Sequence, residues 1–216
     1  MEKSQYAQEE FLRLLVRLVV EELCKWERSV PVGVSNRHVH LNRADMNTLF
    51  GEDSELTRVK ELGQPGQYAS AETVTSQGSK GELKRMRVLG PLRGESQVEI
   101  SIGDGFALGV HPPVRESGQL EGTPGIKMVG PNGEVELKRG VIAALRHIHL
   151  DPATAERMGV HDKQIVRAEI GGLRGAVLNN VLIRVSDKFA PEMHIDVEEA
   201  NALGVKNGDR AYILPD

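Results

Sequence analysis

Two short stretches of the sequence each carry a pair of histidines separated by one residue. His38 and His40 lie in SNRHVHL, and His147 and His149 lie in RHIHL. Residues i and i+2 of a β-strand point to the same face of a sheet, so each pair would place two imidazoles side by side. Imidazole is a preferred ligand of zinc and related divalent ions. A single pair could equally be structural, but two pairs predict a metal site.

A third histidine, His194, lies in a repeat of the unit around His149. HLDPATAERMGV at 149–160 matches HIDVEEANALGV at 194–205, and HLN at 40–42 begins a looser copy. Asn and Asp are common helix N-caps, so each unit is predicted to be a strand end, a histidine and a capped helix. The recurrence indicates duplicated supersecondary structure. A stable strand-to-helix corner explains the caps, but not the histidine in front of each one. The capped helices are predicted at 42–50, 151–159 and 196–203.

A carboxylate and an arginine are further candidates. Glu99 lies in the alternating stretch QVEISI, where Val98 and Ile100 would face a core and leave Glu99 exposed on the opposite face. On spacing alone, Glu99 is therefore not assigned to a metal. Arg93 lies in the glycine-bounded loop GPLRGES, where it could present its planar guanidinium to phosphate or carboxylate, or be a solvated turn residue.

Other charged and histidine residues near these motifs are predicted to have no chemical role. Arg37 and Arg146 precede the two pairs and would point away from the neighbouring histidines, so a structural ion pair is expected for each. His111 and His161 lie outside the repeated units and are expected to be ordinary surface or loop histidines.

Composition excludes several classes of protein. The chain has 216 residues, a net charge of −4 and one cysteine, Cys24, which excludes a disulfide framework and a thiolate zinc site. No basic stripe is present, so no nucleic-acid partner is expected. No Walker motif or dinucleotide fingerprint is present, so a nucleoside triphosphate or dinucleotide site has no sequence support. Apolar runs near the N-terminus are broken by Arg13, Arg17 and Glu21, and no membrane span or secretory signal is predicted. We expect a cytoplasmic protein.

Turn-like pairs of Gly and Pro divide most of the chain into short apolar runs, which predicts many short strands. Their regular spacing predicts a mainly β fold, a sandwich or a barrel. The strands are expected at 30–35, 97–102, 134–145, 181–186 and within 207–214.

The segment 8–27 is the one strong helical pattern, with a wide apolar face. Two interpretations are open. The plainer one, which we prefer, is a helix packed on its own domain or on a dimer partner. The other is a detachable targeting helix that docks on another protein.

Six longer motifs resemble those of a known family. They are PVGVSNRHVHL, QPGQYASAETVT, VLGPLRGESQVEIS, GTPGIKMVGPNGEVEL, GVIAALRHIHL and EMHIDVEEAN. In this order, from near Pro31 to the C-terminus, they resemble the phosphate propanoyltransferases (PduL-type phosphotransacylases). The N-terminal helix is the part that they do not cover.

The resemblance implies an activity and a site. The reaction is the reversible conversion of acyl-CoA (propanoyl-CoA or acetyl-CoA) and phosphate to acyl phosphate and CoA, with two Zn²⁺ ions in one cleft. One zinc would take His38, His40 and Glu99 and leave a position for the CoA sulfur; the other would take His147, His149 and His194 and leave positions for water or phosphate. Arg93 would position phosphate. The implied CoA contacts are Ser35, Lys60, Arg87, Leu89, His194 and Asn201.

The resemblance also implies an organisation of the chain. Two small β-barrels capped by short α-helices would be formed by 29–36 with 145–216 and by 37–144, each contributing one histidine pair. Residues 1–28 would be an N-terminal amphipathic helix. Some family members carry such an extension to enter bacterial microcompartments, as in propanediol degradation, so shell or core proteins are candidate partners of residues 1–27. A homodimer or higher homo-oligomer is expected.

Two other functions fit the metal cluster without the resemblance. One is a di-zinc hydrolase of thioesters, which would release CoA without phosphate. The other is a non-enzymatic metal-binding assembly protein, in which the N-terminal helix binds the partner.

Overall fold

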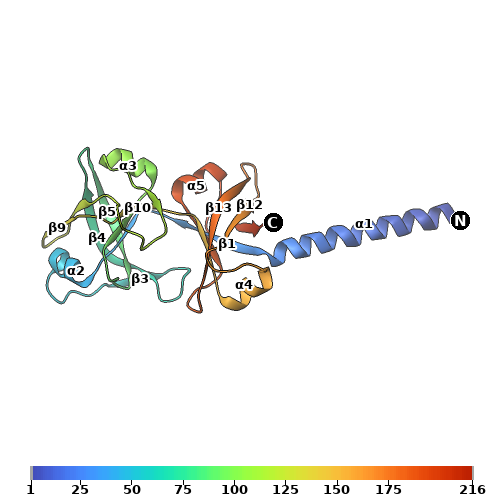
Figure 1. Cartoon of the computed structure of the whole chain (residues 1–216), viewed down its shortest axis with the longest axis horizontal. Helices are drawn as coiled ribbons and strands as arrows, with labels where there is room; N and C mark the ends of the chain where they lie inside the picture. Colours follow the sequence, from blue (N-terminus) through green and yellow to red (C-terminus); the bar gives the residue numbers. More distant parts are fainter. Residues whose placement is uncertain (1, 216) are drawn as a thin grey trace.

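The computed structural model describes residues 2–215 and, among their side chains, those of residues 8–23 and 25–215. Strands dominate the body of the molecule, which consists of two sheets lying side by side, with one long helix projecting from the end (Figure 1). The predicted mainly β class is confirmed.

The first sheet is a closed barrel of six strands. In the order in which they pair, the strands are β1 Ser29–Ser35, β14 Glu192–Asp196, β11 His147–Leu150, β13 Ala176–Val185, β12 Ile165–Ile170 and β15 Arg210–Ile213. The barrel interior is aliphatic, with Ile148, Ile183 and Met193 fully buried. Because β1 pairs with both β14 and β15, the barrel joins the start of the chain's body to its C-terminal end. Periodicity could not predict this crossed connection.

The second sheet is open and curled. Its strands, in order, are β7 Val114–Arg115, β10 Val141–Ala144, β6 Gln97–Glu99, β2 His38–His40, β5 Glu82–Gly90, β4 Tyr68–Gln77, β8 Ile126–Val129 and β9 Glu134–Leu137, with β3 Arg58–Glu61 beside β4. The resemblance predicts two barrels, and only the first sheet is closed. The order runs from β7 to β9 without these end strands pairing, and β7 is only two residues long. The second sheet still encloses a core of its own, around Leu41, Met86 and Met128.

The three capped helices are α2 Arg43–Phe50, α4 Pro152–Met158 and α5 Val197–Leu203, as predicted. In each, the side chain of Asn42, Asp151 or Asp196 accepts a hydrogen bond from the backbone N–H three residues later. The glycine that ends the helix in both closer copies of the repeat is also explained. Gly159 and Gly204 end their helices with φ of 66° and 67°, a left-handed conformation that favours glycine.

Two predicted strands differ from the observed elements. The predicted strand 97–102 stops at Glu99, because Ser101 caps a further helix, α3 Ile102–Leu108, in a reciprocal capping box with Asp104. The predicted strand 134–145 is divided into β9 and β10 by a turn in which Gly140 has φ of 125°. Val98, Ile100 and Ile102 alternate through the first interruption, so the pattern did not reveal it. At the second, Arg139 breaks the alternation between Leu137 and Val141 and, with Gly140, was the available signal of the turn.

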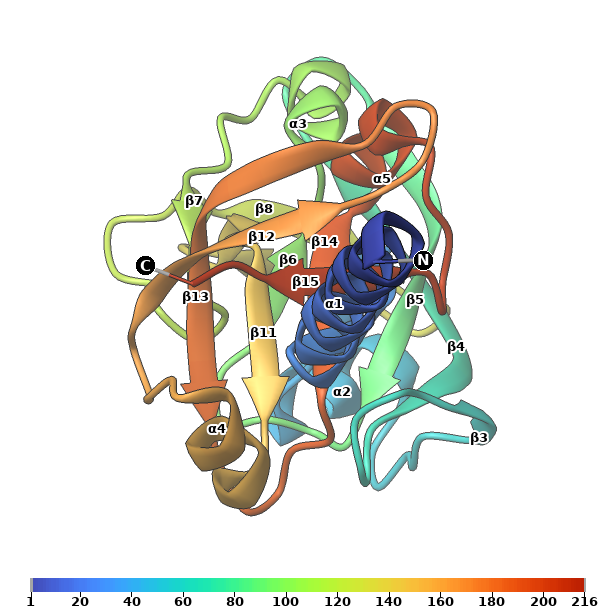
Figure 2. The ribbon, with the colours of Figure 1, turned by 90° about the vertical axis from the view of Figure 1, so that its right-hand side faces the viewer.

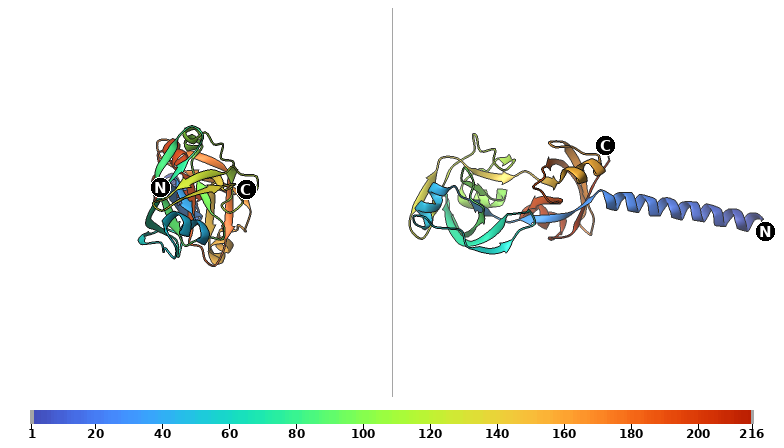
Figure 3. Two further views of the ribbon diagram at one scale, coloured as in Figure 1. Left: turned by 90° about the vertical axis from the view of Figure 1, so that its left-hand side faces the viewer. Right: turned by 90° about the horizontal axis from the view of Figure 1, so that it is seen from below.

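The N-terminal helix, α1 Glu2–Glu27, extends away from both sheets (Figures 2 and 3). Its apolar side chains from Phe11 to Leu23 are about half exposed or more, so the interpretation that it packs on its own domain is wrong for this structure. Contact with the barrel is confined to the end of the helix, where Lys25 pairs with Glu169 at 3.0 Å and Trp26 lies under the Arg210 guanidinium. Among the described residues, no helix is both long and apolar enough to cross a membrane.

Candidate functional site

The first histidine pair lies on β2 beside Glu99 on β6. The two strands are antiparallel, with His38 opposite Glu99 and His40 opposite Gln97. Nε2 of His38 lies 3.2 Å from Nε2 of His40 and 3.5 Å from a carboxylate oxygen of Glu99. All three side chains are buried. We call His38, His40 and Glu99 the open-sheet cluster.

The expectation of an exposed Glu99 is wrong. Val98 faces the core of the open sheet, as the alternation predicts, and Glu99 does lie on the opposite face. That face is covered too, however, because it is turned toward the cleft beside the barrel, and Glu99 is only 8% exposed. A carboxylate buried beside two imidazoles is a candidate metal ligand rather than a wall residue.

The second pair lies on β11 beside His194 on the antiparallel β14. His147 is directly opposite His194, and His149 is opposite Glu192. The ring centroids of His147, His149 and His194 are 4.6 to 5.0 Å apart. We call these three histidines the barrel cluster. The i, i+2 prediction is therefore confirmed for both pairs, and His194 lies with the second pair, as the family resemblance implied.

The nitrogen atoms of both clusters fit a metal. Nδ1 of His38 lies 2.8 Å from the carbonyl of Asn36, and Nδ1 of His147 lies 2.7 Å from that of Leu145, so each ring donates from Nδ1 and presents Nε2 as a lone pair. Both ring nitrogens of His149 are buried with no hydrogen-bond partner among the described residues. A buried polar group left in this state costs about 1–3 kcal/mol. In each cluster the ligand atoms lie within 4.8 Å of one another.

Electrostatics distinguish the two clusters. Burial lowers the pKa of His147 to about 3 and that of His149 to about 2, and the neighbouring histidines add to the effect. Burial also disfavours the charged forms of His38 and Glu99, but their mutual attraction outweighs it: the pKa of His38 is raised and that of Glu99 is held well below its usual value. His147 and His149 are thus neutral near pH 7, whereas the open-sheet cluster contains an ionised carboxylate.

Arg93 lies beside the open-sheet cluster and is held by a serine. Its Nη1 donates to Oγ of Ser117 at 2.9 Å, and that hydroxyl donates to Glu99 at 3.0 Å. Gln97, which pairs with His40 across the strands, also donates to Ser117. Burial lowers the pKa of the Arg93 guanidinium, which remains a cation at neutral pH.

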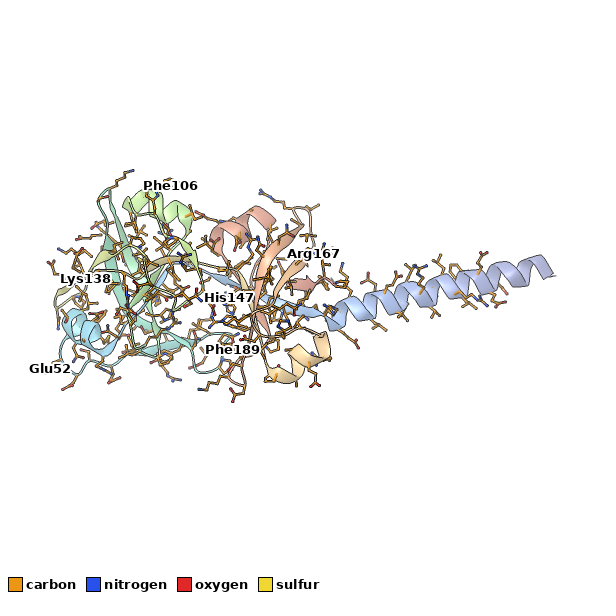
Figure 4. All side chains as sticks on the ribbon, viewed as in Figure 1. Glu52, Phe106, Lys138, His147, Arg167 and Phe189 are labelled. Carbon is orange, nitrogen blue, oxygen red and sulfur yellow. The ribbon has the colours of Figure 1, made fainter. Side chains whose placement is uncertain are left out.

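Both clusters and Arg93 line one cleft, of volume about 670 Å³, between the two sheets. His147 and Phe189 mark this junction in Figure 4. Five of the six predicted CoA contacts line it: Ser35, Lys60, Arg87, Leu89 and, as part of the barrel cluster, His194. Arg87 is opposite His38 on the parallel strand β5, with Nη1 donating to the carbonyl of Ser70 at 2.8 Å. Asn201, exposed on α5, is not among the residues that line the cleft.

The ion pairs expected for Arg37 and Arg146 are present, and Arg37 also lines the cleft. Arg37 pairs with Asp104 at 2.8 Å, and Arg146 pairs with Glu199 at 2.8 Å. His111 and His161 are exposed and lie outside the cleft lining.

Comparison with known proteins assigns the family. Residues 31–206 match the family model described as phosphate propanoyltransferase. The chain belongs to the phosphate propanoyltransferase family. It is therefore an acyltransferase. Two curated phosphate propanoyltransferases cover nearly the whole chain. One, from Thermotoga maritima, is 57% identical over 90% of this chain and 93% of its own length. Another, from Salmonella typhimurium, is 50% identical over 92% of this chain and 93% of its own length. The phosphate propanoyltransferase from Rhodopseudomonas palustris is 59% identical over 83% of this chain and 80% of its own length.

The phosphate propanoyltransferase match includes every metal-ligand and cleft residue predicted above and leaves all of α1 outside. Sequence reasoning missed several other residues of the cleft. Glu192 could have been found, because it stands two residues before His194 and shares its face. Arg184 and Ser117 carry no such signal, because strand pairing and a loop bring them to the site.

Proposed function

We propose that the cleft converts acyl-CoA and phosphate to acyl phosphate and CoA, reversibly, with propanoyl-CoA or acetyl-CoA as substrate. The observation that carries this proposal is the pairing of two unlike clusters in one cleft with a buried arginine beside them. The barrel cluster, whose ligands are all imidazoles, suits the more highly charged partner, phosphate, and the open-sheet cluster, which includes the Glu99 carboxylate, suits the singly charged thiolate of CoA. The family match supports the same pair of substrates.

Each cluster supplies three protein ligands, as in catalytic zinc sites, which leave a position for substrate. We propose Zn²⁺ as the ion for both, with His38, His40 and Glu99 holding one and His147, His149 and His194 the other; other divalent metals suit the same donors. Zinc bound there would polarise oxygen ligands and favour deprotonated sulfur.

Arg93 is proposed to position phosphate for direct attack. A phosphate oxygen would attack the thioester carbonyl carbon, the carbonyl electrons would move to oxygen, and collapse of this intermediate would break the C–S bond and release thiolate. Arg93 supplies fixed cationic donors, and its hydrogen bond to Ser117 holds the guanidinium in place before substrate binds. A buried cation is more effective here than a solvated one, because little water competes for its donors.

The CoA part of the substrate is proposed to lie along Ser35, Lys60, Arg87 and Leu89, with His194 and Asn201 as further contacts. Lys60 and Arg87 provide positive charge for the phosphates of CoA. Asn201 would have to meet the part of CoA that extends beyond the cleft.

Phosphate dependence is the test of this function. CoA release from propanoyl-CoA and acetyl-CoA should require inorganic phosphate and yield acyl phosphate in equal amount. Equal release without phosphate would support a thioester hydrolase instead. Trapping of a covalent acyl-enzyme would overturn direct attack, and retention of function after loss of both clusters would support a non-enzymatic assembly protein.

We further propose that residues 1–27 recruit the enzyme to a partner, such as a microcompartment protein in the cytoplasm, or to a second copy of the chain. The exposed apolar face of α1 supports a docking role. Co-localisation of a tagged chain with and without residues 1–27, together with the mass of each in solution, distinguishes these partners. A two-part body made of 29–36 with 145–216 and of 37–144 stays a prediction that limited proteolysis can test.

A further inference from the structure

One loop of the open sheet anchors two arginines that come from different sheets. Ser117 accepts from Arg93, which follows β5, and the adjacent Glu116 pairs with Arg184 on barrel strand β13, with 3.2 Å between Nε and the carboxylate oxygen. Because their anchors are consecutive residues, the two guanidiniums reach the same region of the cleft, and both line it.

Arg184 is also tied to the barrel cluster. It pairs with His149 across the parallel strands β11 and β13. Its guanidinium lies 5.5 Å from the ring centroid of Phe189, and that ring stacks on His149 with the centroids 4.1 Å apart. The side chain is 23% exposed. Arg184 therefore stands next to the proposed phosphate position while keeping access to the cleft.

The guanidinium of Arg184 retains unused hydrogen-bonding capacity. Among the described residues, neither of its Nη groups donates a hydrogen bond, and Nε is the atom that meets Glu116. Glu116 pairs with Lys163 as well as with Arg184: Nζ of Lys163 lies 2.5 Å from Oε1 of Glu116, the oxygen that Arg184 also contacts. One carboxylate between two cations leaves a local excess of positive charge, to which the buried Arg93 adds.

We propose that Arg184 is a second phosphate-binding residue, which holds the phosphate together with Arg93. This proposal rests on the proposed function and assigns to it a residue from the barrel side of the cleft. A phosphate dianion offers enough oxygens for two guanidiniums, and planar guanidinium groups match its geometry. Phosphate bound in this way would link the two sheets across the cleft.

The test compares Arg184→Gln with Lys163→Gln in the metal-loaded enzyme. Both substitutions remove one cation from Glu116, but Lys163 is exposed and lies outside the cleft lining. Arg184→Gln should raise the KM for phosphate by about 10- to 100-fold, the range expected for losing a hydrogen bond from a charged donor, while the KM for acyl-CoA stays nearly unchanged. Lys163→Gln should leave both values near those of the wild type.

A binding measurement separates this proposal from the proposed function. Inorganic phosphate should raise the melting temperature of the wild type and of Lys163→Gln, and should raise that of Arg184→Gln much less. This shift in melting temperature can be measured even if CoA release proves independent of phosphate. Phosphate-independent release would overturn the proposed function but not the binding of phosphate by Arg184. An unchanged phosphate KM and melting shift in Arg184→Gln, or equal changes in Lys163→Gln, would overturn the role of Arg184. If Arg184→Gln does not fold, Arg184→Lys decides, because loss of the planar fork should still raise the phosphate KM.

Discussion

The open-sheet cluster and the barrel cluster are built by the same local rule and differ in charge. Each has two histidines at i and i+2 on a strand that leads into a capped helix. The partner strand completes the site in both, with Glu99 in one and His194 in the other. A carboxylate in the open-sheet cluster leaves a bound dication with a smaller net charge than three neutral imidazoles do.

This difference shows how a repeated unit can yield two candidate sites with different charges. The histidine unit supplies candidate metal ligands in both places, and one residue from the partner strand sets the charge. We assign the thiolate to the open-sheet cluster and phosphate to the barrel cluster because the partner strand supplies Glu99 in the first and His194 in the second.

The largest effect is expected from removing one cluster at a time. If each cluster holds a metal as proposed, His149→Ala should abolish metal binding at the barrel cluster, and His40→Ala should do so at the open-sheet cluster. Because a metal contributes several kcal/mol of transition-state stabilisation, each should lower the rate of CoA release by at least about 1,000-fold. Metal analysis should find half of the wild-type content in each variant. Loss of all metal from either one would contradict two separate sites.

Removing the charge of Glu99 tests whether this carboxylate accounts for the difference between the two clusters. Glu99→Gln keeps the shape of the side chain but removes its charge, and it should lower activity by about 100-fold, the upper end of the range for changes around a metal. The remaining activity should show a higher KM for acyl-CoA and a nearly unchanged KM for phosphate. Glu95→Gln is the matched control, since Glu95 pairs with Arg139 at the surface. A rise confined to the phosphate KM would reverse the assignment of the two clusters.

Glu192 allows the barrel cluster to be weakened alone. Its carboxylate lies 3.1 Å from Nε2 of His194. It also accepts a hydrogen bond of 3.1 Å from Nε2 of Gln64, which lies in the loop between β3 and β4 of the open sheet. It also lies so close to Gly33 and Gly63 that a Cβ on either would come within 2.7 Å of its oxygens. Glu192→Gln should lower the metal affinity of the barrel cluster by about 10- to 100-fold, the usual cost of changing a residue that orients a ligand.

Chelator competition measures this affinity for each cluster. Gly63→Ala should act in the same direction as Glu192→Gln, because the new methyl group would displace the Glu192 carboxylate. Gly94→Ala is its control, since a Cβ there has no neighbour within 4 Å. Equal weakening of both clusters would mean that Glu192 supports the whole cleft rather than His194.

Local rules predicted much of the site, and pairing between distant strands accounts for what they missed. The shared faces of the histidine pairs and the three helix caps depend on neighbouring residues, so they were correct. Whether Glu99 is buried depends instead on what covers the second face of β6, and alternation describes only one face. Ser117 reaches the cluster from an irregular loop that has no periodic signal.

The same limit applies to the fold. Turn spacing predicted a mainly β protein, but closure of a sheet depends on whether its end strands meet, which no local pattern reports. The family motifs implied the crossed use of the first strand and also implied a second closed barrel, where the structure has an open sheet. For α1, the amphipathic pattern predicted the helix but left its contacts undecided.

The smallest effect is expected from shortening α1, whose described side chains contact neither cluster. Deletion of residues 2–23 keeps Lys25 and Trp26, with their contacts to Glu169 and Arg210, and removes the part of the helix whose described side chains are exposed. The values of kcat and KM should stay within about threefold of the wild type, and the melting temperature should hardly change, because little buried surface is lost. Deletion of residues 2–27 also removes both anchors and should lower the melting temperature while sparing metal content. If the shorter deletion reduced the metal content of one cluster, α1 would have to act on the cleft, and the separation between helix and catalytic body would be wrong.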